Sequence, residues 1–395
     1  MITTERFKVS YSAETDVFIV GNIKTKKYIK LGLKEAKYLF FRAGIRDMEP
    51  IMGSNISMEN YDCDKELSRQ QQQFLDEKFI EWGLTGAEQK RKKERFMDFS
   101  MIKLVDFNPT PILNHLTAVS TFFFSPMGVV LFFALEFVKY FFFIQDIGEI
   151  GQVTFTLRTE QIAVMDIVVC VIMLLFSMVI HELAHACMCK KYGGEVSKIG
   201  LVLFYLGPCL YCDVSDIYML QNKKMVRNVA GAGLYMNLYF GCIAYLVFHF
   251  LLRYHFFSLG LLLFNFANIG LVLINLIPFV KYDGYWILSS FLKIDNLMDK
   301  SVLLLLMGFF NHKEFFNIRI PMFKKVVMGI YGLIALVFKP LFWLKALDFV
   351  YELLNQNVIL RIVIIAMVAL IVASDLCKNV KRYRNLYQNR RYIFV

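Results

Sequence analysis

The chain has 395 residues, 57% of them hydrophobic and 39 of them Phe, which is more apolar than an ordinary soluble protein. Its net charge of +11 comes without a recognition motif for nucleic acid, so the charge does not indicate a nucleic-acid partner. The eight Cys are spread through apolar segments, unlike the disulfide framework of a small secreted protein. The composition therefore predicts a membrane protein.

Residues 1–88 are expected to form a small folded domain in the cytoplasm, because they contain neither a membrane-spanning run nor a signal-peptide pattern. Hydrophobic and polar residues alternate over 7–12 and 16–30, which is typical of strands. Helices are predicted over 34–43 and 64–82, each followed by a glycine. A β-hairpin followed by helices predicts a small α+β domain of the winged-helix type.

The rest of the chain is expected to be mainly α-helical and to cross a membrane about six times, with both termini in the cytoplasm. A basic linker over 89–120 leads to a membrane core over 121–290, then to C-terminal membrane helices over 291–377 and a basic tail over 378–395. A further apolar run, 301–310, is short and predicts a half-inserted or interfacial helix. The predicted spans are 122–144, 161–187, 229–252, 257–280, 325–346 and 357–377.

The basic clusters predict the orientation of these spans. Lys and Arg concentrate over 90–95, 223–227 and 378–391. Such clusters collect on the cytoplasmic side of membranes, where anionic lipid is also found. If the six spans cross the membrane alternately outward and inward, all three clusters lie on the cytoplasmic side.

His181, Glu182 and His185 belong to the motif HELAH, which carries the most chemical information in the chain. Residues four apart share one face of a helix, so the two imidazoles can bind one zinc ion while Glu182 acts on the metal-bound water as general base. The preceding segment 167–180 carries no charge, and an ionisable residue at the end of such a segment is costly unless it is functional. The motif therefore predicts a hydrolytic zinc site within the membrane.

A third protein ligand is expected, and Asp283 is the candidate. It follows Asn275 and Pro278 of the fourth predicted span, and Asn275 lies at about the depth of His181. Pro278 cannot continue a helix without losing a hydrogen bond, so the chain can break there and turn Asp283 back toward the metal. Gly284 would allow the backbone to approach closely.

HELAH followed about 95 residues later by N-x-x-P-x-x-x-x-D-G resembles the site-2 protease family of intramembrane zinc metalloproteases. The resemblance covers about residues 160–290. It implies that His181, His185 and Asp283 bind zinc and that Glu182 is the catalytic base.

Two Asn residues fall on further positions of this resemblance. Asn237 ends a G-x-x-x-N segment that is similar to one on the helix between the two motifs of the family. The resemblance implies that Asn275 holds the substrate backbone or the oxyanion. Packing at a helix kink is an equally good interpretation of Asn275.

A narrower resemblance is carried by the segments 278–286 (PFVKYDGYW) and 213–216 (DVSD). They are similar to segments of the peptide zinc metalloproteases found with bacterial modified-peptide or bacteriocin gene clusters. Residues 1–88 are similar in pattern to the winged-helix-like domain of the PQQ-chaperone type, which grips leader peptides. These resemblances imply a bacterial plasma-membrane protein with a small peptide substrate, its leader held by residues 1–88, and an ABC transporter or a modifying enzyme as partner.

Several interpretations stay open. The apolar segment 200–214 predicts a pair of strands, which in the resembled family presents an extended substrate. Four thiols could bind a second metal, although packing as small apolar residues is favoured for them; they are Cys187, Cys189, Cys209 and Cys212. The main alternative function is a non-catalytic peptide-binding component of an export or immunity system. A zinc-binding transporter is a further alternative function.

Overall fold

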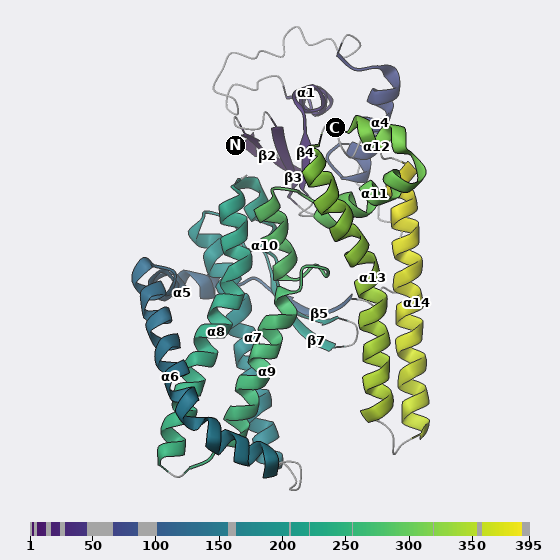
Figure 1. Cartoon of the computed structure of the whole chain (residues 1–395). Coiled ribbons are helices and arrows are strands. Elements are labelled where there is room, and N and C mark those ends of the chain that lie inside the picture. Colours follow the sequence, from purple (N-terminus) through teal and green to yellow (C-terminus); the bar gives the residue numbers. More distant parts are fainter. Residues whose placement is uncertain are drawn as a thin grey trace.

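Figure 1 shows the computed structural model of the chain, in which long helices are joined to a small sheet-containing unit near the N-terminus. The structure describes residues 2–3, 6–12, 17–23, 28–45, 66–85, 101–156, 163–204, 207–220, 222–254, 256–318, 320–353 and 358–388. The predicted fold class is confirmed. The described chain is mainly α-helical, with six helices long and apolar enough to cross a membrane and a small α+β unit at the N-terminus.

The N-terminal unit is an antiparallel sheet covered by two helices. Its strands follow the order β1-β2-β3-β4, and the covering helices are α1 and α4. The bounds are β1 Ile2–Thr3, β2 Phe7–Ser12, β3 Val17–Asn22, β4 Tyr28–Leu31, α1 Leu33–Arg42 and α4 Arg69–Glu81. Alternate residues of β2 and β3, among them Val9 and Phe18, pack against the helices, which explains the period of two in the sequence. Ser68 caps α4 in a capping box with Gln71, so this helix begins at residue 69, later than the predicted 64.

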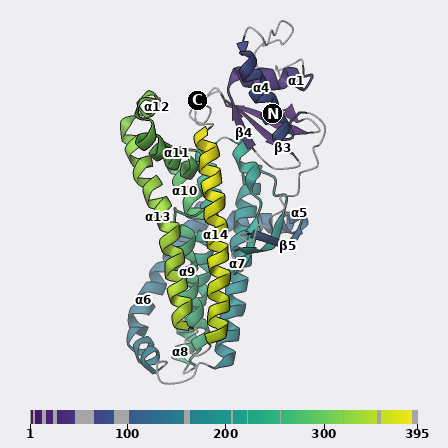
Figure 2. The same cartoon turned by 90° about the vertical axis from the view of Figure 1, so that its right-hand side faces the viewer.

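Six long helices form the membrane part, in the number predicted. They are α6 (Pro126–Thr156), α7 (Val164–Lys191), α8 (Lys223–Arg253), α9 (Leu259–Leu276), α13 (Met322–Leu353) and α14 (Val358–Gln388). Figure 2 shows α13 and α14 side by side, next to the group formed by α6 to α9. The fourth helix ends at Leu276, before the predicted 280, because the residue that precedes Pro278 is driven into an extended conformation.

A second sheet lies beside α7. Its strands β5 (Met101–Phe107), β6 (Ile199–Phe204) and β7 (Gly207–Cys212) are antiparallel in that order. The pair β6–β7 confirms the strands predicted over 200–214. The basic run 90–95 lies outside the described residues, but the later part of the predicted linker contains β5 and most of α5 (Thr110–Phe123). A short 3-10 helix, η1 (Ser215–Leu220), follows β7.

Three further helices connect the two membrane groups. They are α10 (Asp283–Leu292), α11 (Leu297–Phe310) and α12 (His312–Asn317). The predicted half-inserted segment 301–310 belongs to α11, which packs against α13 and α14. Val302, Leu303 and Leu304 are each at most 1% exposed, so protein rather than lipid encloses this part of the helix.

The N-terminal unit docks on the membrane part through the face of β3 that points away from α1 and α4. Ile19 is buried on this face, and a Cβ atom at Gly21 would lie 3.2 Å from Met219 Sδ of η1. Three hydrogen-bonded contacts accompany it: Tyr28 Oη donates to Asp216 at 3.2 Å, Lys30 Nζ lies 2.6 Å from Asp295, and Lys8 Nζ lies 2.8 Å from Glu195. The unit is therefore held next to the segment that follows β7.

Candidate metal centre

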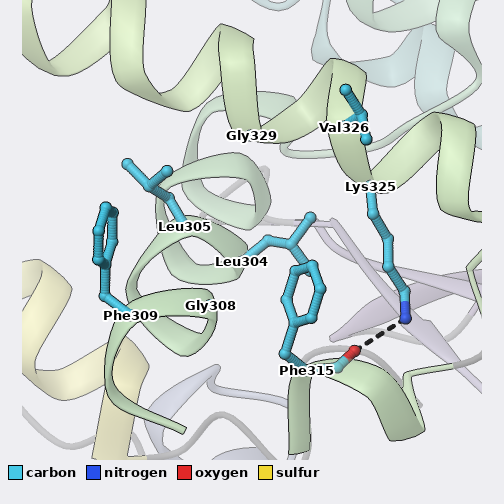
Figure 3. Close-up of a pocket in the computed structure, with 8 residues that line it drawn as sticks. All are labelled: Leu304, Leu305, Gly308, Phe309, Phe315, Lys325, Val326 and Gly329. Atoms are coloured by element: carbon cyan, nitrogen blue, oxygen red, sulfur yellow. Dashed lines mark hydrogen bonds between the residues drawn. The ribbon is translucent and has the colours of Figure 1, made fainter. Parts of the chain in front are cut away.

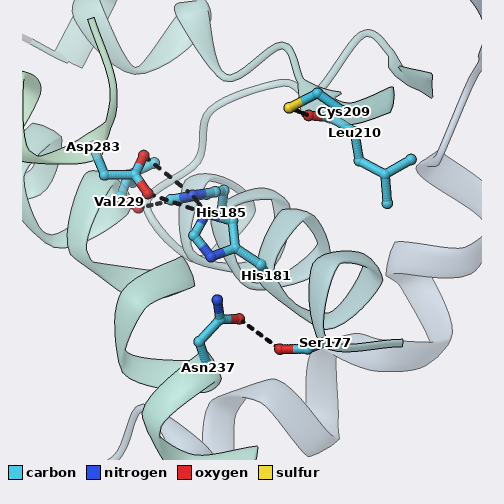
Figure 4. Close-up of polar contacts among 8 residues, drawn as sticks. All are labelled: Ser177, His181, His185, Cys209, Leu210, Val229, Asn237 and Asp283. Carbon is cyan, nitrogen blue, oxygen red and sulfur yellow. Dashed lines mark hydrogen bonds and ion pairs between the residues drawn. The ribbon is translucent and has the colours of Figure 1, made fainter. Parts of the chain in front are cut away.

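His181 and His185 lie on one face of α7, in its C-terminal third. Their Nε2 atoms are 3.0 Å apart, and both side chains are buried. Asp283, the first residue of α10, points its carboxylate at them, with Oδ2 3.0 Å from His181 Nε2 and Oδ1 3.4 Å from His185 Nε2. Figure 4 shows the three side chains converging. In the described part of the chain, this is the one group of three His, Cys, Asp or Glu side chains whose ligand atoms lie within 4.8 Å of one another.

The three side chains fit a zinc ion. Two ligands that are each about 2.0–2.1 Å from zinc and at the tetrahedral angle lie roughly 3.3 Å apart, close to the separations in this centre. Burial raises the pKa of Asp283, but the two adjacent imidazoles outweigh it and hold the pKa well below its ordinary value. The carboxylate is therefore ionised, as a metal ligand must be.

The orientation of His185 is set by α8. Its Nδ1 lies 2.7 Å from the backbone carbonyl oxygen of Val229, so Nδ1–H donates there and the lone pair of Nε2 faces the ligand cluster. A hydrogen bond from the second ring nitrogen is the usual support of a metal-binding His.

Gly233 lets α8 approach both imidazoles. A Cβ atom at this position would lie 2.5 Å from His185 Nε2 and 2.6 Å from His181 Nε2. Both distances are far inside van der Waals contact, so any side chain at residue 233 would push into the centre. The close approach gives the glycine of the G-x-x-x-N segment a physical reason.

Asp283 reaches the centre because α9 breaks before it. Ile277 is extended, and the chain turns through Pro278 before α10 begins. Tyr331 of α13 donates its hydroxyl to the carbonyl oxygen of Pro278 at 2.7 Å. This bond ties the turn to the C-terminal helices.

Gly284 closes the same turn. A Cβ atom at Gly284 would lie 2.1 Å from the carbonyl oxygen of Leu276, so the backbone of α10 rests directly on the end of α9. Pro278 and Gly284 thus shape the turn that carries Asp283, and neither lines the cleft beside the ligands.

Glu182 lines a cleft of about 430 Å³ that also contains the three ligands. The backbone N–H of Cys212, at the end of β7, donates to its carboxylate. Asn237 and Asn275 line the same cleft, so the structure brings the predicted polar residues together. The remaining walls are largely apolar or aromatic, among them Met178, Leu210, Tyr211, Ile217, Tyr218, Leu271, Tyr282 and Trp286.

Two supporting groups could not be selected from the sequence. The acceptor at Val229 is a backbone carbonyl, which any residue type supplies. Tyr331 lies on α13, outside the segment covered by the family motifs. Its one sequence signal is a Tyr in an apolar helix, which is more often explained by packing.

The four thiols do not gather into a metal-binding group within the described residues. Cys209 and Cys212 line the cleft, whereas Cys187 and Cys189 are buried in the core cluster around α7. Burial, together with the nearby carboxylates of Glu182 and Asp283, raises the pKa of Cys209 to about 11. Cys209 is therefore a neutral thiol near pH 7.

A second cavity, of about 290 Å³, lies between α11, α12 and α13. Figure 3 shows its lining, which is apolar apart from Lys325. The ammonium of Lys325 donates to the carbonyl oxygens of Phe315 and Phe316 at 2.8 and 3.3 Å. Lys325 is thus the one polar side chain of this lining, and its ammonium is directed at backbone carbonyl oxygens.

The comparison with curated proteins connects the chain to a metalloprotease. It is 32% identical over 131 residues to a protein of Bacillus subtilis (strain 168) named "Putative peptide zinc metalloprotease protein YydH". The match covers 33% of this chain and 50% of that protein, so the chain spans about half the length of the curated relative it matches. No family model and no solved structure matches the chain. The similarity supports a related family, a metalloprotease role and zinc as the metal.

Proposed function

We propose that the protein is a zinc-dependent intramembrane endopeptidase that cleaves a small membrane-associated peptide. The observation that carries the proposal is the convergence of His181, His185 and Asp283 beside Glu182, in a cleft at the end of a helix long enough to span a membrane. The relation to a protein named as a peptide zinc metalloprotease supports the same chemistry.

The metal and the residues of the cleft have different roles in the proposed reaction. His181, His185 and Asp283 would hold zinc, which would supply a Lewis acid for the scissile carbonyl and for the attacking water. Glu182 takes the proton of the attacking water and passes it to the leaving amine, as a general base and then a general acid. Asn275 donates its amide N–H to the peptide backbone or to the developing oxyanion.

The peptide is presented in an extended conformation on β7. One side of β6 is occupied by β5, and β7 is the last strand of this sheet in the described chain. Leu210, Tyr211 and Cys212 of β7 line the cleft, so a peptide that pairs with this strand passes the ligands. The apolar and aromatic walls favour a hydrophobic peptide.

The N-terminal unit holds a more distant part of the same peptide, such as a leader. The unit contacts η1, the segment that follows β7, through Asp216 and Met219. This position supports the proposal that one peptide contacts both the unit and β7. We further propose a bacterial plasma-membrane location with both termini in the cytoplasm, a role in the maturation or export of a ribosomally made modified peptide such as a bacteriocin, and an ABC transporter or modifying enzyme as partner.

Removal and return of the metal tests this function. The full chain in lipid nanodiscs is incubated with a library of short hydrophobic peptides, and products are read by mass spectrometry. We expect cleavage that stops after zinc is chelated and returns when one equivalent of zinc is added. Cleavage that survives complete removal of zinc would contradict the proposal, and zinc binding without any cleavage would favour a non-catalytic peptide-binding component.

A further inference from the structure

The two metal-binding imidazoles are supported unequally. His185 donates through Nδ1 to the carbonyl oxygen of Val229, whereas Nδ1 of His181 is buried and has no hydrogen-bond partner. When Nε2 of a neutral imidazole binds a metal, the single ring proton is on Nδ1, which then requires an acceptor. A buried donor without an acceptor is destabilising, so a neighbour of His181 is expected to supply the acceptor.

A buried polar network lies next to this ring and joins the three central helices. It consists of Ser177 of α7, Asn237 of α8 and Asn268 of α9, none of which is more than 2% exposed. Ser177 Oγ is 2.8 Å from Asn268 Oδ1 and 3.4 Å from Asn237 Oδ1. Figure 4 shows the other end of the Asn237 amide directed toward the His181 ring.

The number of available protons determines which atoms of this network donate hydrogen bonds and which accept them. Asn268 Nδ2 donates to the backbone carbonyl oxygen of Asn237 at 2.9 Å, so its Oδ1 must be the atom that faces Ser177. The hydroxyl of Ser177 has one proton and gives it to that oxygen at 2.8 Å. Ser177 can then only accept from Asn237, which requires the amide nitrogen of Asn237 to face the hydroxyl.

We propose that Asn237 is the hydrogen-bonding partner that holds His181 for the metal. A half-turn of its amide about Cβ–Cγ places Nδ2 against Ser177 Oγ and directs Oδ1 at His181 Nδ1–H. The oxygen and nitrogen of an amide occupy nearly the same volume, so this turn requires no repacking. The Ser177 hydroxyl and His181 Nδ1–H then each have an acceptor, and His181 is held with the lone pair of Nε2 toward the metal.

Ser177 and Asn268 are positioning residues in this arrangement, because they act on His181 only through the Asn237 amide. The inference rests on the proposed zinc site, but it concerns metal affinity rather than cleavage. Loss of a hydrogen-bonded neighbour of a metal-binding His typically lowers metal affinity by about 10–100-fold.

The test measures the zinc dissociation constant of the full chain in nanodiscs, by competition with a chromophoric chelator. Asn237→Leu should weaken zinc binding by about 10–100-fold. Asn237→Asp keeps an oxygen acceptor and should bind zinc at least ten times more tightly than Asn237→Leu. Ser177→Ala, a small truncation, should weaken binding in the same direction but less.

Asn265→Leu is the matched control. Asn265 is also a buried Asn of α9, but its amide nitrogen donates to Leu261 of its own helix, so zinc affinity should stay at the wild-type value. ¹⁵N NMR of His-labelled protein should also show the His181 proton on Nδ1 in the zinc-loaded wild type. Wild-type zinc affinity in Asn237→Leu would overturn the inference, even if cleavage were lost, because Asn237 would then act on the substrate. Failure of the wild-type chain to bind zinc would instead reject the metal centre itself.

Discussion

Among single residues, Gly233 of α8 is as important for the metal centre as the ligand side chains of α7 and α10, because it has no side chain. Gly233 is in contact with both imidazoles, and the two ring nitrogens would lie 2.5 and 2.6 Å from any Cβ atom placed there. Two of the three proposed ligands are thus positioned by the lack of a side chain.

Gly233→Ala should therefore displace the imidazoles. Overpacking of a well-packed site costs about 1–3 kcal/mol, which corresponds to roughly a 10–100-fold loss of zinc affinity. Gly231→Ala is the control on the same helix, because a Cβ atom there meets nothing within 4 Å. Zinc titration of both variants checks this prediction, and equal affinities would contradict the contact of Gly233 with the ligands.

At the scale of elements, the break between α9 and α10 links the two membrane groups. The turn carries Asp283, and α13 holds it through the hydrogen bond from Tyr331 to Pro278 and through the contact of Phe279 with the Tyr331 ring, at 5.6 Å between centroids. The C-terminal helices therefore support the centre through this turn.

Tyr331→Phe keeps the ring and removes the hydroxyl that holds this turn. A net hydrogen bond contributes about 1 kcal/mol, and a misplacement approaching 1 Å can lower a rate by about a hundredfold. We expect kcat/KM for peptide cleavage to fall by roughly ten- to a hundredfold while helical content stays unchanged. Tyr254→Phe, at an 82% exposed position, should retain wild-type activity, and a Tyr331→Phe enzyme of wild-type activity would show that the turn is held by other contacts.

At the scale of the whole molecule, the N-terminal unit and the membrane part meet at Asp295. Its carboxylate contacts Lys30 of β4 and Lys223 at the start of α8. Burial raises the pKa of Asp295, but hydrogen bonds from Lys223 and Lys30 outweigh it, and the pKa lies below the ordinary value. A carboxylate of this kind contributes stability above its unfolded-state pKa of about 3.9 and loses it only as the pH falls through the lower folded-state value.

Asp295→Asn should therefore loosen the docking of the N-terminal unit at neutral pH. We expect faster amide hydrogen exchange in β4 at pH 7, whereas the wild type should show the same protection at pH 5 as at pH 7 once intrinsic exchange is corrected. Glu81→Gln serves as the control, because its pair with Lys78 lies within α4 and does not cross the interface. Unchanged exchange in Asp295→Asn would mean that the other contacts of the interface hold the unit, namely the apolar face around Ile19 and the pairs Tyr28–Asp216 and Lys8–Glu195.

The sequence was sufficient for the features that repeat along the chain or depend on a local motif. Apolar runs predicted the six membrane helices, and alternation predicted β2, β3 and the pair β6–β7. The HELAH spacing, the depth of Asn275 and the break at Pro278 predicted three side chains, His181, His185 and Asp283, whose ligand atoms the fold brings within 4.8 Å of one another.

Features that depend on contacts between distant segments were not predictable in this way. The predicted linker 89–120 contains β5. This strand is not recognisable locally, because its partner β6 lies about a hundred residues later. Three such contacts produce no repeating pattern in the sequence, because each joins two segments at a single point. They are the hydrogen bond of His185 to the Val229 carbonyl, that of Tyr331 to Pro278, and the docking of β3 on η1. The domain boundaries and the leader-binding role of residues 1–88 stay predictions.

Zinc content and cleavage of short hydrophobic peptides are measured for the wild-type protein and for Glu182→Gln, each in nanodiscs. This change removes the general base and leaves His181, His185 and Asp283 in place. We predict about one zinc per chain in both proteins and a cleaved product from the wild type alone. A Glu182→Gln protein that cleaves at the wild-type rate would contradict the account.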